Sequence, residues 1–226
     1  MNKFYEFKKV NEEETELYIY GDITSLKWFE DDVTSYDFAK ELAQIDTDLK
    51  VRINSYGGEV SQGLAIYNLL KSFDKKVTTI CDGFACSSAS VIFMAGDERI
   101  MNKASLLLIH NAWTQAVGDS NELRKQAEDL EKVTKPSIDI YVSATGLDES
   151  KIREMMDEET WLTSDEALEM GFATKVVEDE PKQSINEMYL NHQVMENKKL
   201  AKQLKELNEK IKDLQSDHNS WTEFFK

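Results

Sequence analysis

Short apolar segments rich in β-branched residues alternate with amphipathic segments over most of this chain. The segments predicted to be strands are residues 16–21, 50–54, 76–81, 98–101, 105–110 and 175–177. The segments with helical spacing are residues 35–45, 60–73, 87–95, 120–144, 148–156 and 164–170. Alternation of strand and helix is typical of a parallel sheet with crossover helices, so we expect an α/β protein.

Glycine and proline indicate where several of these elements end. Asp82-Gly83 is predicted to form a turn after the third strand. Pro136 falls inside the long helix and predicts a kink or a break there. The last helix is expected to have Ser164 as its N-cap and Gly171 as its stop signal.

Composition limits the classes of partner. The chain is 41% apolar, enough for a core, and its net charge is −16. Such a charge argues against nucleic acids and anionic membranes, which basic patches bind. No apolar leader follows Met1 and no run approaches the roughly 20 apolar residues of a membrane span, so we expect a cytoplasmic protein. Cys81 and Cys86 lack zinc-site spacing and are predicted to be buried free thiols, and no cofactor or metal is expected.

One serine and one histidine stand out as candidate catalytic groups. Ser87 lies in the small-residue sequence GFACSSAS at the start of an apolar helix, and His110 ends the apolar strand LLLIH. The other histidines, His192 and His218, lie in a polar tail, so His110 is the one imidazole that the folded body offers. A serine hydroxyl needs such a base at neutral pH. The pairing indicates acyl transfer, with hydrolysis the leading interpretation.

Neighbouring residues suggest the rest of a serine-hydrolase site. Gly57 and Gly58 follow a strand, where positive φ angles can expose backbone N–H groups to an oxyanion. Ser88 and Ser90 compete for the role of nucleophile on chemistry alone. An acid should orient the base, and the sequence Asp-Glu-Glu at 157–159 offers three candidates. Spacing does not choose among them.

Several motifs in order resemble those of the Clp protease proteolytic subunit (ClpP) over about residues 16–177. They are INSYGG at 53–58, GFACS at 83–87, LIH at 108–110, WLTSDEA at 161–167 and GFA at 171–173. The chain is most similar to the phage and prophage branch, whose members resemble prohead proteases. The segments typical of that branch are LYIYGDI at 17–23 and MMDEETW at 155–161.

The resemblance implies roles for particular residues. Ser87 would be the nucleophile and His110 the general base. The backbone N–H groups of the oxyanion hole would come from the segment that holds Gly57 and Gly58 and from Ser88. Such a site hydrolyses peptide bonds without a cofactor.

Three departures from the family pattern bear on this site. Glu159 stands where the family has an aspartate as the triad acid, and Asp157 is the fallback. Tyr56 replaces a proline of the glycine motif, and Asn-Ala-Trp at 111–113 replaces Gln-Pro after the histidine. We expect the last two changes to alter the substrate groove and leave the chemistry intact.

The resemblance also implies a fold and an assembly. Residues 1–177 would form a ClpP-like domain with the spiral crotonase-like α/β fold. The segment after His110 would form a strand and a long handle helix at 119–144. Family members join these segments into homo-oligomeric rings, often two stacked heptameric rings.

Residues 178–226 lie outside the family pattern. An acidic linker leads into leucines and an isoleucine with alternating spacings of four and three, at Leu200, Leu204, Leu207, Ile211 and Leu214. This seam predicts a short coiled-coil helical extension, which could bind a partner, target a capsid or pack on its own body. An isolated helix of this length is marginal in water, so a frayed tail is the alternative.

The leading functional hypothesis is a serine endopeptidase that matures a phage head, acting on capsid or scaffold proteins without an ATPase. One alternative is a Clp-type proteolytic subunit served by an ATPase unfoldase. Another is a catalytically silent assembly or scaffold protein, which the substitution at Glu159 favours. An acyl-CoA enzyme of the crotonase type is the least favoured, since that class needs no Ser–His pair.

Overall fold

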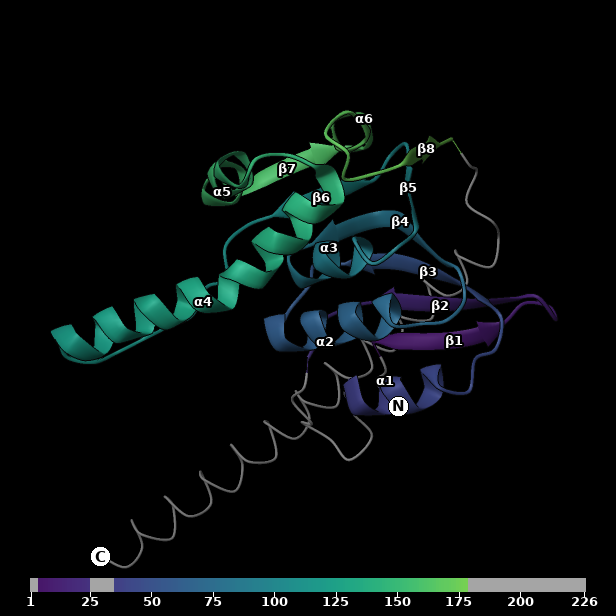
Figure 1. Ribbon diagram of the computed structural model, residues 1–226, viewed down its shortest axis with the longest axis horizontal. Coiled ribbons are helices and arrows are strands. Elements are labelled where there is room, and N and C mark those ends of the chain that lie inside the picture. The colour runs from purple at the N-terminus through teal and green to yellow at the C-terminus, as the bar shows by residue number, and fades with distance from the viewer. Residues whose placement is uncertain (1–3, 25–34, 179–226) are drawn as a thin grey trace, which may run out of the picture. The chain divides into compact units, whose positions relative to one another are not determined.

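A mixed β-sheet lies at the centre of the structure, and helices pack against it (Figure 1). The computed structural model describes residues 4–24 and 35–178. The strands there are β1 (Tyr5–Lys9), β2 (Glu14–Tyr20), β3 (Asp48–Ser55), β4 (Val77–Cys86), β5 (Glu98–Asn102), β6 (Leu106–Ile109), β7 (Thr160–Thr163) and β8 (Lys175–Val177). The helices are α1 (Ser35–Leu42), α2 (Val60–Lys71), α3 (Ser88–Phe93), α4 (Ser120–Thr145), α5 (Glu149–Asp157) and α6 (Ser164–Glu169). The predicted α/β class is confirmed.

Most strands of the sheet run parallel, as the alternation with helices predicts. The main order is β1-β2-β3-β4-β5-β8, and β6 pairs with both β4 and β7. Only the pairs β1–β2 and β6–β7 are antiparallel among the described strands. The sequence pattern did not predict β1 or β7. In the case of β7, four residues are too few to show a clear period of two.

The longest strand, β4, runs through the residues that were predicted to form a turn, Asp82-Gly83. Its first half pairs with β5 over Thr78–Cys81, and its second half pairs with β6 over Phe84–Cys86. The predicted turn at Asp82-Gly83 is wrong, because the chain stays extended while its hydrogen-bonding partner changes. A Cβ at Gly83 would lie 2.7 Å from Asn54 Oδ1. The Asn54 side chain therefore lies against Gly83, and its Oδ1 accepts a hydrogen bond from the Phe84 N–H at 3.1 Å.

The hydrophobic core lies between the sheet and the helices α2 and α3. Leu49, Val51 and Ile53 alternate along β3 and are fully buried, as expected for a strand with one face in the core. Ile66 and Leu70 of α2 are buried in the same cluster. Every residue of α3 is buried. The helix that follows Ser87 is therefore held in place by the core.

A polar cluster joins four neighbouring strands of the sheet. Arg52 of β3 forms an ion pair with Asp82 of β4, with 2.9 Å between Arg52 Nε and Asp82 Oδ2. The Tyr20 hydroxyl of β2 and the Asn102 amide of β5 also donate to Asp82, at 2.8 and 3.0 Å. Burial raises the pKa of Asp82, and the Arg52 charge opposes that shift. Its partners keep the buried carboxylate satisfied.

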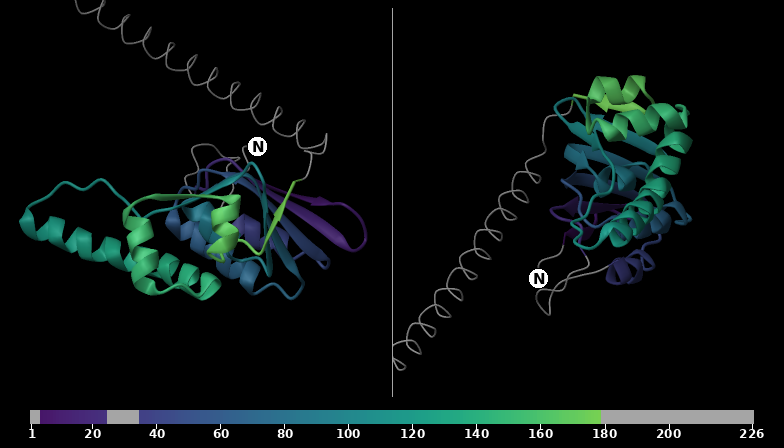
Figure 2. Two further views of the ribbon diagram at one scale, coloured as in Figure 1. Left: turned by 90° about the horizontal axis from the view of Figure 1, so that it is seen from above. Right: turned by 90° about the vertical axis from the view of Figure 1, so that its left-hand side faces the viewer.

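Helix α4 confirms the predicted long helix, and it has no break at Pro136. The helix continues on both sides of Pro136. Proline removes one backbone donor, but the carbonyl it would bond belongs to Lys132, which is exposed to water. Burial of Ile138 and Tyr141 in the following turns anchors the second half. The first half projects away from the sheet in both figures (Figures 1 and 2).

The segment between β6 and α4 differs from the implied handle. Residues 111–119 form neither a helix nor a strand, so the strand expected after His110 is absent. An extended segment becomes a strand only when its backbone pairs with a neighbour. Residues 113–119 are exposed, and no described strand lies beside them.

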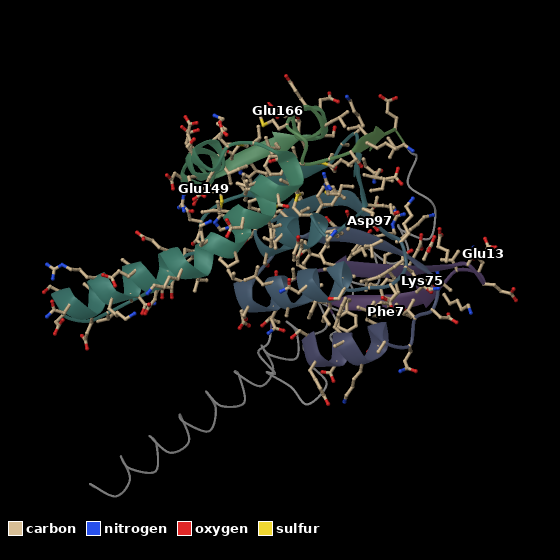
Figure 3. The ribbon with its side chains drawn as sticks, in the orientation of Figure 1. Phe7, Glu13, Lys75, Asp97, Glu149 and Glu166 are labelled. Carbon is tan, nitrogen blue, oxygen red and sulfur yellow. The ribbon has the colours of Figure 1, made fainter. Side chains whose placement is uncertain are left out.

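Helix α6 and strand β8 lie where the sequence predicts them, but the N-cap of α6 differs from the predicted residue. The N-cap of α6 is Thr163, whose side chain accepts from the Glu166 N–H while Glu166 (labelled in Figure 3) accepts from Thr163. The predicted cap, Ser164, is buried and donates to the Lys103 carbonyl at 3.1 Å. Gly171 follows α6 with φ of +81°, as predicted for a stop signal. The predicted coiled coil lies outside the described residues.

Candidate active site

Ser87 occupies a strained corner between β4 and α3. Its backbone angles are φ 56° and ψ −127°, which L-residues adopt at a cost of about 1–3 kcal/mol. The Ser87 N–H donates to the Leu108 carbonyl of β6 at 3.0 Å, which holds the corner against the next strand. The side chain is partly exposed, whereas its competitors Ser88 and Ser90 are buried. Of the three serines, Ser87 is the one that a substrate can reach.

The glycine turn after β3 lies directly against this corner. A Cβ at Gly57 would lie 2.4 Å from the Cys86 carbonyl oxygen and 3.0 Å from the Ser88 nitrogen. Gly57 and Gly58 have φ angles of +92° and +146°, which glycine adopts without a steric penalty. The two segments, 30 residues apart in sequence, therefore approach closely because no side chain separates them.

The backbone N–H groups at this junction are not all available to a ligand. The Gly57 N–H donates to the Ser55 hydroxyl at 3.0 Å, and that hydroxyl donates to the Gly21 carbonyl at 2.6 Å. The N–H groups of Gly58 and Ser88 have no hydrogen-bond partner within the described residues. These two groups are the ones that can donate to an incoming oxygen atom.

His110 lies just beyond the end of β6, next to the Ser87 corner. Leu108, two residues earlier, accepts the bond from Ser87, and side chains two apart on a strand share a face. The imidazole is partly exposed. Within residues 4–24 and 35–178, no hydrogen bond joins His110 to the Ser87 hydroxyl or to an acidic side chain. The structure brings the two elements together without joining the two side chains.

The two candidate acids lie at the turn between α5 and β7. Ile109 pairs with Thr160, so continuing this antiparallel register would place Glu159 opposite His110. Glu159 is exposed and has a φ angle of +49°, which is unusual for a residue with a side chain. Asp157 accepts a hydrogen bond from Asn111 Nδ2 at 2.7 Å. Asp157 therefore already binds the residue after the histidine.

Aromatic side chains from three segments gather beside the site. Tyr56 stacks on Phe84 with 5.1 Å between ring centroids, and Phe84 meets the edge of Trp161 at 6.0 Å. Tyr56 and Trp161 are exposed. In the sequence, Tyr56 stands out only as the replacement of a proline in the glycine motif. No local pattern identifies the cluster, because its members come from the turn after β3, from β4 and from β7.

Other chemistries find little support near Ser87. Cys81 and Cys86 are buried free thiols, as predicted. Burial raises the pKa of Cys86 to about 11 and that of Cys81 to about 12, so neither is a thiolate at neutral pH. Among the described residues, no group of three or more His, Cys, Asp or Glu side chains could hold a metal ion. None of the helices in the described ranges is long and apolar enough to span a membrane.

Comparison with known proteins agrees with this architecture. A family model described as Clp protease matches residues 14–180, so the chain belongs to the Clp protease family. The ATP-dependent Clp protease proteolytic subunit 1 of Protochlamydia amoebophila is 36% identical over 129 residues, which are 55% of this chain and 63% of that protein. The ATP-dependent Clp protease proteolytic subunit of Deinococcus radiodurans is 33% identical over 135 residues, 59% of this chain and 66% of that protein. The chain thus matches just under two thirds of the length of these relatives.

A solved structure agrees with the fold. The structure titled "ClpP1 N165D mutant from Listeria monocytogenes" has a TM-score of 0.62 and 22% sequence identity, covering 73% of this chain and 91% of that one. The predicted ClpP-like fold and the resemblance to the Clp proteolytic subunit are confirmed. The phage branch stays a prediction.

Proposed function

We propose that this chain is a serine endopeptidase whose nucleophile is Ser87. The observation that carries the proposal is the junction of the Ser87 corner with the glycine turn. A partly exposed serine hydroxyl lies there beside two backbone N–H groups that have no partner in the described residues. Membership of the Clp protease family supports the same chemistry.

The proposed reaction follows from these groups. Ser87 Oγ attacks the carbonyl carbon of a peptide bond while His110 removes its proton. The N–H groups of Gly58 and Ser88 donate to the oxyanion that forms. His110 then gives the proton to the departing amine, and water hydrolyses the acyl-enzyme by the same steps. Gly57 contributes by leaving room for the Ser88 donor.

We assign the acid of the triad to Glu159 in place of the fallback, Asp157. The register between β6 and β7 supports this choice. The bond between Asp157 and Asn111 gives Asp157 a different role, bracing the segment that follows His110. Glutamate reaches one bond farther than aspartate, which suits its exposed position at the turn.

The side chains of the site need an adjustment before catalysis. The Ser87 hydroxyl and His110 must come within hydrogen-bonding distance, and such bonds often tighten only in a complex. Apolar side chains at Trp113, Val117 and Leu123 are exposed on the segment after His110 and on α4. We infer that copies of this chain assemble through that surface into rings, and that assembly aligns His110.

Labelling with a fluorophosphonate probe tests the nucleophile. We expect one probe per chain by intact mass, no label on Ser87→Ala, and full labelling of the control Ser72→Ala, an exposed serine distant along the chain. Peptide hydrolysis should disappear with the label. Persistent labelling or hydrolysis in Ser87→Ala would refute the assignment. A wild-type chain that does not label in its assembled form would favour the silent scaffold, which the missing Ser87–His110 bond also favours.

We propose that the substrates are capsid or scaffold proteins of a phage head, cleaved without an ATPase. The resemblance to the prohead branch supports this narrower proposal. Cleavage of an unfolded protein without ATP or an unfoldase would support it. Cleavage that requires an ATP-driven unfoldase would favour the alternative, a Clp-type proteolytic subunit.

A further inference from the structure

A chain of buried hydroxyl groups connects helix α4 to the backbone of Ser87. Ser90 Oγ lies 2.6 Å from the Ser87 carbonyl oxygen and 2.7 Å from the Tyr141 hydroxyl. Ser90 is fully buried and Tyr141 is 1% exposed. The two residues are 51 positions apart in sequence, and the proposed reaction uses neither of them.

The direction of these bonds follows from counting protons. A carbonyl oxygen can only accept, so Ser90 donates its single proton to Ser87. The Tyr141 hydroxyl must then donate to Ser90 Oγ. Burial raises the pKa of Tyr141 well above its usual range, so the phenol keeps this proton at any pH near neutral.

The Ser87 carbonyl is fixed by more than this one bond. It also accepts from the N–H groups of Ser90 and Val91, at 2.9 and 3.3 Å. On the other side of the same residue, the Ser87 N–H donates to Leu108 at 3.0 Å. Both peptide units that flank the strained Ser87 corner are therefore held in place.

Holding the Ser87 carbonyl also orients the next N–H group. The peptide unit is planar and trans, so its C=O and N–H bonds point in opposite directions. The carbonyl of Ser87 and the N–H of Ser88 belong to one such unit. Because Ser90 fixes the carbonyl on the inner side, the Ser88 N–H must point away from Ser90, where the described chain offers it no partner.

We propose that Ser90 and Tyr141 are positioning residues that aim the Ser88 N–H at the oxyanion of the reaction. This inference rests on the proposed function, because it assigns the Ser88 donor a role in peptide hydrolysis. Ser90 and Tyr141 touch no reacting atom. They act through the Ser87–Ser88 peptide. Through Tyr141, the second half of α4 therefore helps to position the Ser88 N–H.

The test uses the paired variant Ser90→Ala/Tyr141→Phe in the full-length chain. This pair removes the hydroxyl chain without leaving either group buried and unpartnered. The matched control is Thr79→Val, since Thr79 is fully buried and donates to the Phe93 carbonyl at the other end of α3, at 2.8 Å. Both changes remove a buried bond to a carbonyl at an end of α3, but only the first reaches the Ser88 N–H.

We expect a fall in kcat with KM unchanged in the paired variant. Loss of a whole oxyanion donor lowers kcat roughly 100- to 1000-fold, so a misdirected donor should lower it about tenfold. A peptide aldehyde, which forms a tetrahedral adduct with an oxyanion, should bind weaker by a similar factor. Thr79→Val should keep the wild-type kcat and aldehyde affinity, even if its unfolding free energy falls as much as that of the paired variant.

Two results would overturn the inference, and they are distinct. An active wild-type chain whose paired variant matches the Thr79→Val control would refute the role of Ser90 and Tyr141 alone. A wild-type chain that neither labels with fluorophosphonate nor hydrolyses peptides would refute the proposed function, and this role with it.

Discussion

Gly57 is closely packed against the residues around the candidate nucleophile. A Cβ at this position would overlap the Cys86 carbonyl and the Ser87 side chain, at 2.4 and 2.7 Å. The overlap involves backbone that β6 and α3 hold, so the neighbours cannot move aside easily. Any side chain at Gly57 must push the glycine turn away from the proposed oxyanion donors.

We expect Gly57→Ala to abolish peptide hydrolysis and fluorophosphonate labelling. The matched control is Gly146→Ala, because Gly146 also has a positive φ of 75° but has no atom within 4 Å of its Cβ position. The control should lose about 1 kcal/mol of stability from backbone strain and keep its activity. Urea unfolding and probe labelling of both variants check this prediction. Equal activity in the two would show that the glycine turn is not part of the site.

Glu159 and Asp157 lead to separate predictions, because we assign Glu159 to His110 while Asp157 binds Asn111. Glu159→Gln should lower kcat by orders of magnitude, since a neutral side chain cannot stabilise the charged imidazole. Asp157→Asn should have a much smaller effect, because an amide oxygen can still accept the bond from Asn111. Steady-state kinetics with one peptide substrate compares them. If the order of the two effects is reversed, the acid is Asp157.

Arg99 joins elements that the sheet alone would not hold together. Its guanidinium donates to the carbonyls of Phe172 and Gly171 after α6, at 2.8 and 3.0 Å. It also donates to Ala144 near the end of α4 and to Gly96 before β5, at 3.2 and 3.4 Å. Burial lowers the pKa of Arg99, but a guanidinium stays charged in proteins. One side chain thus binds carbonyl oxygens of the segment after α6, of the last turn of α4 and of the segment before β5.

Arg99→Met should lower the unfolding free energy by about 2 kcal/mol or more. The four carbonyl oxygens lose charge-assisted hydrogen bonds, and a carbonyl that stays buried without a donor is costly. The control Arg153→Met removes an exposed ion pair with Glu149, the α5 residue labelled in Figure 3. A pair of this kind contributes about 0.5 kcal/mol or less. Urea unfolding measures both changes, and a loss in Arg99→Met no larger than in the control would contradict this account.

The described residues form a hydrophobic core of their own. Its buried side chains come from residues 4–173, and the last strand, β8, pairs with β5. The family model also ends near this point, at residue 180. The residues that we assign to the proposed chemistry all lie before residue 178.

A chain ending at Glu178 should therefore remain folded and label at Ser87. Circular dichroism, thermal unfolding and light scattering after size exclusion check the fold and the oligomeric state. An insoluble product would show that the extension belongs to the core. A folded product that no longer assembles would assign the extension a role in assembly.

Local pattern predicted most of the helices and strands but missed β1 and β7, and it failed where distant partners decide the outcome. The strands and helices follow from periods of two and 3.6, which burial imposes on any chain. Asp82-Gly83 looked like a turn, yet pairing with β6 keeps it extended. Thr163 replaced Ser164 as the cap because Ser164 is drawn into a bond with Lys103. In both cases a distant backbone group competes with the local signal.

The candidate site divides in the same way. Ser87 and His110 are candidates from the sequence alone, because a serine at a helix start and a single imidazole in the body can be read without the structure. The donation by Gly57 to Ser55, the brace of Asp157 on Asn111 and the hydroxyl chain through Tyr141 required the tertiary structure. Hydrogen bonds act over about 3 Å, so their partners are decided by how helices and strands pack and not by distance along the chain.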